Sequence, residues 1–278
     1  MQTQEQTTLL CQTLEISRSA YYAHRRKQQC PRRQQDQILL ALINRAFLDS
    51  RKTYGSPRLR MALQRQGHGC GKNRVARLMR QAGLRAQQKR RFVPRTTQSH
   101  HDLPIAPNWL AKVPAPERPD QVWVSDITYL PTQEGWLYLA VTLDACSRKV
   151  VGWWADDTLE TSLVTEALEG ARQRRRPPPG LLHHSDRGVQ YASSRFRRLL
   201  QTHRMTASMS RKGNCYDNAL AESFFASLKT EALGPLLPST KAQARLKVFD
   251  YIEAFYNTKR LHSALGYKSP VEFENQFH

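Results

Sequence analysis

Three acidic residues in strand, strand-end and helix contexts constrain the fold of this chain more than any other feature of its sequence. Asp126 lies inside residues 122–130, VWVSDITYL, whose Val, Ile, Trp, Thr and Tyr predict a strand that ends at Pro131. Asp186 closes a short apolar segment, GLLHHSD, which predicts a buried strand followed by a turn. After 35 intervening residues, Glu222 lies in DNALAESFFASLK, where the apolar spacing predicts a helix.

The three acids predict a metal site if the fold brings them together. Open α/β sheets bind ligands at the carboxyl ends of their strands, which is where Asp186 is expected. Carboxylates at ligand distance repel one another, by about 1 kcal/mol per pair in water and about 4 kcal/mol at an effective dielectric near 20, so a cation is needed. Oxygen ligands favour Mg²⁺ or Mn²⁺, and two such ions can activate an attacking oxygen and stabilise a leaving one. We therefore interpret Asp126, Asp186 and Glu222 as catalytic metal ligands.

Each acid also has a simpler interpretation. Asp186 precedes an Arg-Gly turn, where aspartate is common, and a glutamate on a helix such as Glu222 is commonly solvated. Asp126 is harder to explain this way, because aspartate is depleted in strands. Lys229 follows Glu222 by seven residues, or two helical turns, which places both on one face about 10 Å apart. A cation there suits a phosphodiester chain.

Other polar residues compete for the site. Asp144 is expected to cap a hairpin, and Asp217 or Asn218 to cap the Glu222 helix. His183 and His184 precede Asp186. One of them could position a water or a phosphate, and a hydrogen-bonded histidine at a strand end is the alternative.

The positive charge of the chain is concentrated in its first third. The formal net charge is +20, and residues 1–100 hold 21 Lys and Arg against 4 Asp and Glu. Such an excess predicts a polyanionic partner, so this region is the expected electrostatic contact with nucleic acid. A merely basic, soluble surface is the alternative.

The cysteines and the hydropathy exclude several classes of protein. The five cysteines are odd in number and show neither a CxxC pair nor a Cys/His pair at zinc spacing, which argues against structural disulfides and zinc. No apolar run approaches the length of a membrane span and no signal peptide is visible, so we expect a cytoplasmic protein.

The basic third predicts helices. Residues 8–26 indicate two short helices with Ser17 as N-cap, either a helix-turn-helix or a packing hairpin, followed by a polar linker at 27–33. A clearer helix at 36–49 carries an apolar stripe of Ile38, Leu39, Leu42, Ile43 and Phe47. Further helices are expected from Pro57 and over 72–83.

The helix over 72–83 has the layout of a recognition helix. Arg74, Arg77 and Arg80 recur every three residues opposite its apolar side, so they are candidate DNA contacts. An exposed basic face that enters no groove is the alternative. Lys89, Arg90 and Arg91 in the following segment, and Lys212 in the loop before Glu222, are further candidates.

The middle of the chain predicts an α/β core. Strands at 122–130, 136–144 and 148–154 are followed by a helix at 159–173, the Asp186 strand, a helix at 196–203, a strand at 205–209 and the Glu222 helix. The order βββαβαβα is that of a ribonuclease-H-like fold, a mixed five-stranded sheet flanked by helices.

The end of the chain predicts one long helix and an irregular tail. The helix at 240–257 is expected to bury Leu246, Phe249, Ile252 and Phe255, and Arg260 and His262 could then pack on the core or on DNA. The whole chain divides into a candidate helix-turn-helix, a helical DNA-binding domain, a basic and Pro-rich linker, the catalytic core and a C-terminal helical segment, at 1–30, 34–86, 87–118, 119–233 and 234–278.

Several segments resemble a known family. The chain is similar to the DDE transposases of the IS-three family of bacterial insertion sequences, in their downstream-frame (OrfB-type) form, within the retroviral integrase superfamily. The segments that carry the resemblance are WVSDITYL (123–130), HSDRGVQY (184–191), SRKGNCYDNALAESFFASLKTE (210–231) and YNTKRLHSALGYKSP (256–270), with a weaker match at 52–84.

The resemblance implies a DNA transposase. Asp126, Asp186 and Glu222 would hold two Mg²⁺ ions, for which Mn²⁺ can substitute, with Lys229 near the DNA and His184 and Asn218 in support. The reaction would be hydrolysis at the element's ends followed by attack of the freed 3′-hydroxyl on target DNA. A ribonuclease-H-type nuclease and a DNA-binding regulator with an idle catalytic domain are the alternatives.

The resemblance also implies partners. These are the terminal inverted repeats of the element and the target DNA, further copies of the chain as a homo-oligomer on DNA, and an upstream-frame portion that acts as a partner or as a fused segment. No membrane partner is expected.

Overall fold

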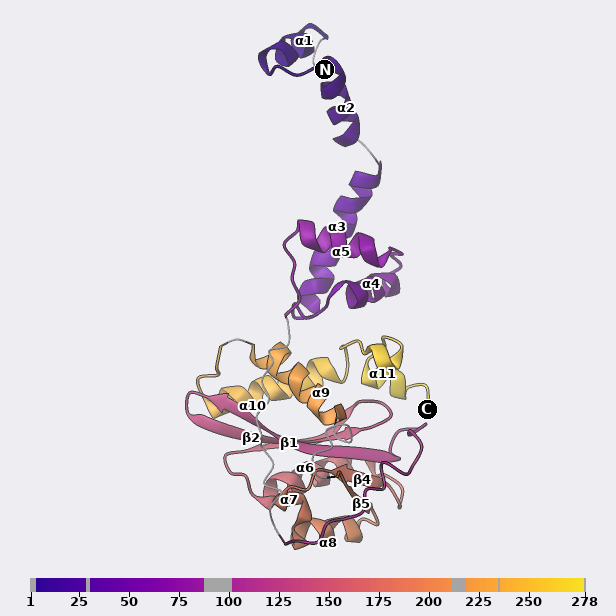
Figure 1. Ribbon diagram of the computed structural model, residues 1–278, viewed down its shortest axis with the longest axis vertical. Helices are drawn as coiled ribbons and strands as arrows, with labels where there is room; N and C mark the ends of the chain where they lie inside the picture. The colour runs from indigo at the N-terminus through magenta and orange to yellow at the C-terminus, as the bar shows by residue number, and fades with distance from the viewer. Residues whose placement is uncertain (1–3, 29–30, 88–101, 212–218, 235, 278) are drawn as a thin grey trace. The chain divides into compact units, whose positions relative to one another are not determined.

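The chain forms two units, Met1–Ala86 and Gln87–His278. The computed structural model describes residues 4–28, 31–87, 102–211, 219–234 and 236–277 (Figure 1). The candidate residues Lys89, Arg90, Arg91, Lys212, Asp217 and Asn218 lie outside this description.

Helices make up the first unit. They are α1 (Gln4–Thr13), α2 (Arg18–Gln28), α3 (Pro31–Asp49), α4 (Ser56–Arg65) and α5 (Lys72–Gln81). Ser17 caps α2 as predicted, since its hydroxyl accepts a hydrogen bond from the Ala20 amide at 3.1 Å. Pro57 occupies the first turn of α4, also as predicted.

Two expectations for this unit are wrong. Residues 27–33 were expected to be a linker, but α2 reaches Gln28 and α3 begins at Pro31. The Arg, Gln and Lys residues there are good helix formers, so their polarity does not end a helix. Ile38 was expected in the core but is 64% exposed, because α3 buries Leu39, Ile43, Ala46 and Phe47 on a face that leaves Ile38 outside.

A mixed five-stranded sheet is the centre of the second unit. Its elements are β1 (Val122–Thr132), β2 (Gly135–Asp144), β3 (Val150–Asp156), α6 (Thr161–Arg175), β4 (Leu182–Ser185), α7 (Val189–Ala192), α8 (Ser194–Thr202), β5 (Thr206–Met209) and α9 (Ala219–Leu228). The strand order is β3-β2-β1-β4-β5. β2 pairs antiparallel with both β1 and β3, and β4 pairs parallel with both β1 and β5. The predicted βββαβαβα order is confirmed, with α7 as one additional short helix.

The strand that holds Asp126 is longer than predicted. β1 continues through Pro131, which lies opposite Trp136 of β2. A proline has no amide hydrogen to donate, so it is rarely found in a strand that is paired on both sides. The pairing of β1 with β4 covers only Val122 to Val124, so the far end of β1 is an edge where Pro131 is tolerated.

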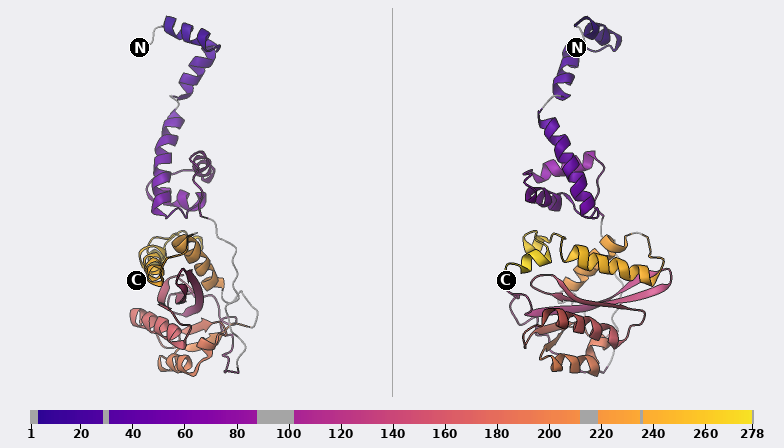
Figure 2. Two further views of the ribbon diagram at one scale, coloured as in Figure 1. Left: turned by 90° about the vertical axis from the view of Figure 1, so that its left-hand side faces the viewer. Right: turned by 180° about the vertical axis from the view of Figure 1, so that it is seen from behind.

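Helices cover both faces of the sheet (Figures 1 and 2). The helices α6, α7 and α8 lie on one face, and α9 and the C-terminal helices lie on the other. The first face holds the main apolar core, which includes Trp123, Leu163, Leu168 and Phe196. Leu163, Ala167 and Leu168 of α6 are buried as predicted.

The segment before β1 is not wholly an extended linker. In its described part, the Trp109 and Leu110 amides donate hydrogen bonds to the Ser208 hydroxyl of β5, at 3.0 and 3.2 Å. Leu103 and Ala106 pack against the main core. Residues 103–110 therefore belong structurally to the second unit, because their apolar side chains find a core to cover.

The C-terminal helix does not follow the expected stripe. After α9 and the π-helical turn η1 (Lys229–Leu233), α10 (Lys241–Phe249) continues as a π-helix, η2 (Asp250–Tyr256). Leu246 and Phe249, which were expected inside, are 69% and 56% exposed, whereas Ile252 and Phe255 are buried. α10 instead buries Ala244 and Val248, which are four residues apart, and Leu246 and Phe249 lie on the side of the helix that this pair leaves outside.

The tail, with η3 (Ser263–Leu265) and α11 (Pro270–Glu274), packs on the catalytic unit. The buried Arg260 guanidinium donates to both carboxylate oxygens of Glu231 in η1, at 2.6 and 2.7 Å. The His262 ring lies edge-on to Tyr256, with 4.9 Å between ring centroids. Of the two alternatives for Arg260 and His262, the structure therefore shows packing on the core.

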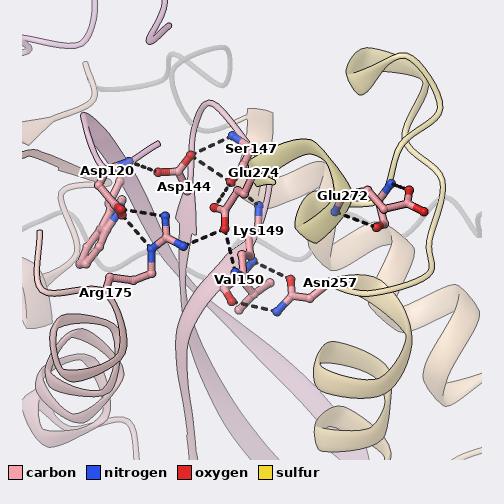
Figure 3. Close-up of polar contacts among 11 residues, drawn as sticks. Asp120, Asp144, Ser147, Lys149, Val150, Arg175, Asn257, Glu272 and Glu274 are labelled. Atoms are coloured by element: carbon pink, nitrogen blue, oxygen red, sulfur yellow. Dashed lines mark hydrogen bonds and ion pairs between the residues drawn. The ribbon is translucent and has the colours of Figure 1, made fainter. Parts of the chain in front are cut away.

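A second polar network joins α11 to the sheet (Figure 3). The Glu274 carboxylate accepts hydrogen bonds from Ser147, Lys149 and Arg175, at 2.7 to 2.8 Å. Asp144 accepts from the amides of Cys146, Ser147 and Asp120, so it caps the hairpin as predicted. These bonds occupy Asp144 in the fold rather than in a metal site.

Gly152 lies in close contact with α6, and a side chain there should destabilise the protein. A Cβ at Gly152 in β3 would lie 2.2 Å from the carbonyl oxygen of Ala167 in α6. We expect Gly152→Ala to lower the free energy of unfolding by about 1–3 kcal/mol, because overpacking forces backbone shifts. Gly170→Ala is the control, since a Cβ at this α6 position meets nothing within 4 Å. It should raise stability by up to about 1 kcal/mol. Urea unfolding of both variants would measure the difference, and equal stabilities would contradict it.

Candidate active site

The pairing of β1 with β4 brings two of the three predicted acids together. These strands are parallel, with Val124 opposite His184. The pairing ends there, and if its register is extended by two residues along each strand, Asp126 falls opposite Asp186, just beyond the carboxyl end of β4. Neighbouring strands lie about 4.8 Å apart, so the two aspartates are close neighbours. Both are partly exposed, as ligand-binding carboxylates must be.

A short turn holds the Asp186 carboxylate in place. Its Oδ1 atom accepts a hydrogen bond from the Gly188 amide at 2.9 Å. The Gly188 carbonyl in turn accepts from the Tyr191 amide at 3.0 Å, so α7 begins directly on this turn. Asp126 accepts from the Ile127 amide through its own Oδ1, at 2.8 Å.

The electrostatics identify the neighbours of this pair. Burial lowers the pKa of Lys229, and the Asp126 carboxylate acts in the opposite direction. Burial raises the pKa of Tyr191 well above its ordinary value, and Asp126 and Asp186 raise it further. Lys229 and Tyr191 therefore lie within electrostatic range of the aspartates.

Glu222 is near the site but does not complete it. It lies on the exposed side of the first turn of α9, and α9 packs against β1. A carboxylate is favoured there by the helix dipole. Among the described residues, no three His, Cys, Asp or Glu side chains are close enough to hold a metal ion. The described residues therefore do not form a three-carboxylate cluster, and the grouping of Asp126, Asp186 and Glu222 stays a prediction.

The two histidines before Asp186 are buried parts of the sheet. His183 shares a hydrogen bond of 2.8 Å with Ser125, and burial, with His184 beside it, lowers the pKa of His183 to about 3. His184 Nδ1 lies 2.9 Å from the Ser208 hydroxyl. Both fit the interpretation as hydrogen-bonded strand residues, and the supporting role of His184 stays a prediction.

The arginines of α5 do not all face solvent. Arg74 and Arg77 both pair with Asp36 of α3, at 2.7 and 2.6 Å, and the hydrogen bond from Arg77 lowers the pKa of Asp36 against the effect of burial. Arg80 is exposed. Of the three candidate DNA contacts, two therefore also tie α5 to α3, a role that the three-residue repeat alone could not show.

Sequence reasoning missed Gly188 and Tyr191 as parts of the site. A Cβ at Gly188 would lie 3.0 Å from Asp186 Oδ1, so a glycine leaves the carboxylate room. The hydroxyl of Tyr191 is buried and has no hydrogen-bond partner in the described structure. Both residues lie in the HSDRGVQY segment, whose resemblance to the family was the only sign of their importance in the sequence. A single sequence does not reveal that Gly188 contacts Asp186 or that the Tyr191 hydroxyl is buried.

Known proteins similar to this chain are transposases and integrases. Residues 116–215 and 203–270 match family models described as integrase core domain, and residues 34–92 match an HTH-like domain. The transposase InsF of insertion sequence IS3A from Escherichia coli is 41% identical over 96% of this chain and 93% of its own length. The chain belongs to the IS3 family of transposases. An uncharacterized 31 kDa protein of the insertion element IS600 from Shigella sonnei is 43% identical over 97% of this chain and 98% of its own length.

As an IS3-family transposase with an integrase core, the chain is a DDE polynucleotidyl transferase. A solved structure of the HTLV-2 integrase catalytic core in complex with magnesium covers 57% of this chain and 98% of its own, with a TM-score of 0.45 and 16% identity. In the described parts of the transposase, no helix is long and apolar enough to cross a membrane.

Gly188→Ala should impair the transposase without unfolding it. The added methyl group would press on Asp186 Oδ1 and displace this carboxylate by a few tenths of an ångström. Asp186 is a candidate metal ligand, so its displacement should misalign the reacting groups. We expect a loss of roughly tenfold or more in strand transfer, since a misplacement of about 1 Å can cost about 100-fold. Strand-transfer assays beside thermal unfolding would measure both. A fully active variant would show that the carboxylate is free to move.

Proposed function

We propose that Asp126, Asp186 and Glu222 hold two divalent cations, Mg²⁺ or Mn²⁺, with which this transposase cuts DNA at the ends of an insertion sequence and joins them to target DNA. The observation that supports the proposal is the register of β1 and β4, which, extended by two residues, brings two partly exposed carboxylates close together. Glu222 is the third ligand on the strength of its spacing and of the packing of α9 against β1.

The donor set fits a hard cation. The pair offers carboxylate oxygens only, and the buried histidines beside it are engaged with Ser125 and Ser208. Oxygen ligands suit Mg²⁺ and Mn²⁺ better than zinc. When bound, such ions stabilise the charge that develops on the attacking and leaving oxygens of a phosphodiester.

The remaining chemistry belongs to side chains of the chain. Asp126 and Asp186 each accept an amide hydrogen bond, which orients the carboxylates that would hold the cations. Lys229 lies near Asp126 and supplies a positive charge for the DNA backbone. The same site would serve first for attack by water and then for attack by the freed 3′-hydroxyl.

The partners follow from the reaction. The substrates are the terminal inverted repeats and the target duplex, and pairing of two ends calls for more than one copy of the chain on DNA. An upstream-frame portion, as a separate partner or a fusion, would add recognition of the ends. This places the protein with the DNA of the bacterial cytoplasm.

Strand transfer in Mg²⁺ against EDTA tests the proposal, with labelled DNA that carries the element's own ends. Asp126→Asn and Glu222→Gln should each reduce the yield of joined products by at least about 100-fold. Each removes a carboxylate ligand of the cations, which stabilise the charge of the transition state. Glu166→Gln, an exposed glutamate on α6, is the matched control and should act as the parent does. Joining by Glu222→Gln at the parental rate would remove Glu222 from the site. Cleavage of any duplex without joining would favour a nuclease, and binding without products a regulator or a missing upstream partner.

The arginines of α5 allow a test of the DNA-binding face. We expect Arg80→Ala to weaken DNA binding without a change in melting temperature. The slope of log binding constant against log salt concentration should fall by about 1, the value for one lost phosphate contact. Arg77→Ala breaks a partly exposed ion pair, so it should also lower stability, by up to about 1 kcal/mol. Fluorescence anisotropy over a salt series, beside thermal unfolding, separates the two effects. Unchanged binding by Arg80→Ala would exclude that side chain as a contact.

A further inference from the structure

Tyr191 is a buried tyrosine whose hydroxyl lacks a partner. Its side chain is 2% exposed at the end of α7. The ring packs edge-on against Phe196, with 5.3 Å between centroids, and beside His183. Its hydroxyl oxygen is enclosed, yet none of the described residues hydrogen-bonds to it. Buried polar groups are nearly always paired, so this exception requires an explanation.

The position of Tyr191 is tied to that of Asp186. The Gly188 amide donates to the Asp186 carboxylate, while the Gly188 carbonyl accepts from the Tyr191 amide. One peptide turn therefore sets both side chains. The carboxylates of Asp126 and Asp186 add to burial in raising the pKa of Tyr191, so the phenol stays neutral beside them.

A second tyrosine shows what the fold does with such a group elsewhere. Tyr251 is also fully buried among aromatic rings, but its hydroxyl donates to Glu231 at 2.8 Å. The core of this protein thus accommodates a buried phenol by pairing it. Tyr191 differs, because its hydroxyl has no such partner and the charged groups that raise its pKa are Asp126 and Asp186.

We propose that the Tyr191 hydroxyl accepts a hydrogen bond from a water ligand of the divalent cation held by Asp126 and Asp186. Mg²⁺ usually keeps several water ligands, and partners in the next layer orient them and strengthen binding. Tyr191 is then a positioning residue, whose partner arrives with the metal. The inference rests on the proposed function, because it needs a cation at the aspartate pair.

Tyr191→Phe should separate stability from metal binding. Without metal, the full-length variant should melt about 2–4 °C higher than the parent, because the ring packing is kept and an unpaired hydroxyl is removed. In a thermal-shift titration with Mg²⁺, it should need about tenfold more metal for half of the stabilisation, the lower end of the effect of outer ligand partners. Tyr251→Phe is the matched control. It should melt lower, because it leaves Glu231 without that donor, and should keep the parental Mg²⁺ midpoint.

Asp186→Asn distinguishes failure of this inference from failure of the proposed function. If the parent shows a Mg²⁺-dependent shift that Asp186→Asn loses, the metal site stands. A parental Mg²⁺ midpoint for Tyr191→Phe would then overturn the role of Tyr191 alone. In that case the partner of the Tyr191 hydroxyl would be a water in the cavity of about 20 Å³ that Tyr191 helps to line, which has room for one. A lower melting temperature of Tyr191→Phe would likewise overturn it. A parent without any Mg²⁺ shift would overturn both.

Discussion

The parallel pairing of β1 with β4 is the constraint on which the rest of the catalytic unit depends. The ladder ends at Val124 and His184, and its register, extended by two residues, brings Asp126 beside Asp186, although their like charges oppose this arrangement. The backbone can impose it because β1 is held on its other side by a long antiparallel pairing with β2. The site is therefore built by the sheet, and the helices add to it.

The C-terminal segment braces this sheet from outside the core. Glu274 of α11 binds Lys149 and Arg175, and Asn257 exchanges two hydrogen bonds with the backbone of Val150 in β3. Arg260 binds Glu231 just after α9. These buried charged groups would be costly if unpaired, so they specify one position for the tail. That position also fixes the end of the helix that carries Glu222.

The sequence predicted the elements better than the contacts. The sequence was enough to predict that Asp126 lies inside one strand and Asp186 directly after another, because strand pattern and length are local properties. The buried face of α10 was missed because it consists of the smaller Ala244 and Val248, whereas the larger apolar Leu246 and Phe249 lie outside. Arg74 was expected on the outer side of α5, and its pairing with Asp36 depends on how α3 crosses α5. The unpaired hydroxyl of Tyr191 is likewise a property of packing.

The charge balance at the aspartate pair argues for a cation more strongly than the residue types alone. Lys229 is half-buried, and the Asp126 carboxylate favours the charged form of its ammonium group. Burial already disfavours that charge, so Lys229 offsets only part of the repulsion between two adjacent carboxylates. The approach of Glu222 would add a third negative charge, which the same lysine cannot balance. A divalent ion removes this repulsion, and a phosphodiester then meets a site that is no longer negative, as a polyanionic substrate requires.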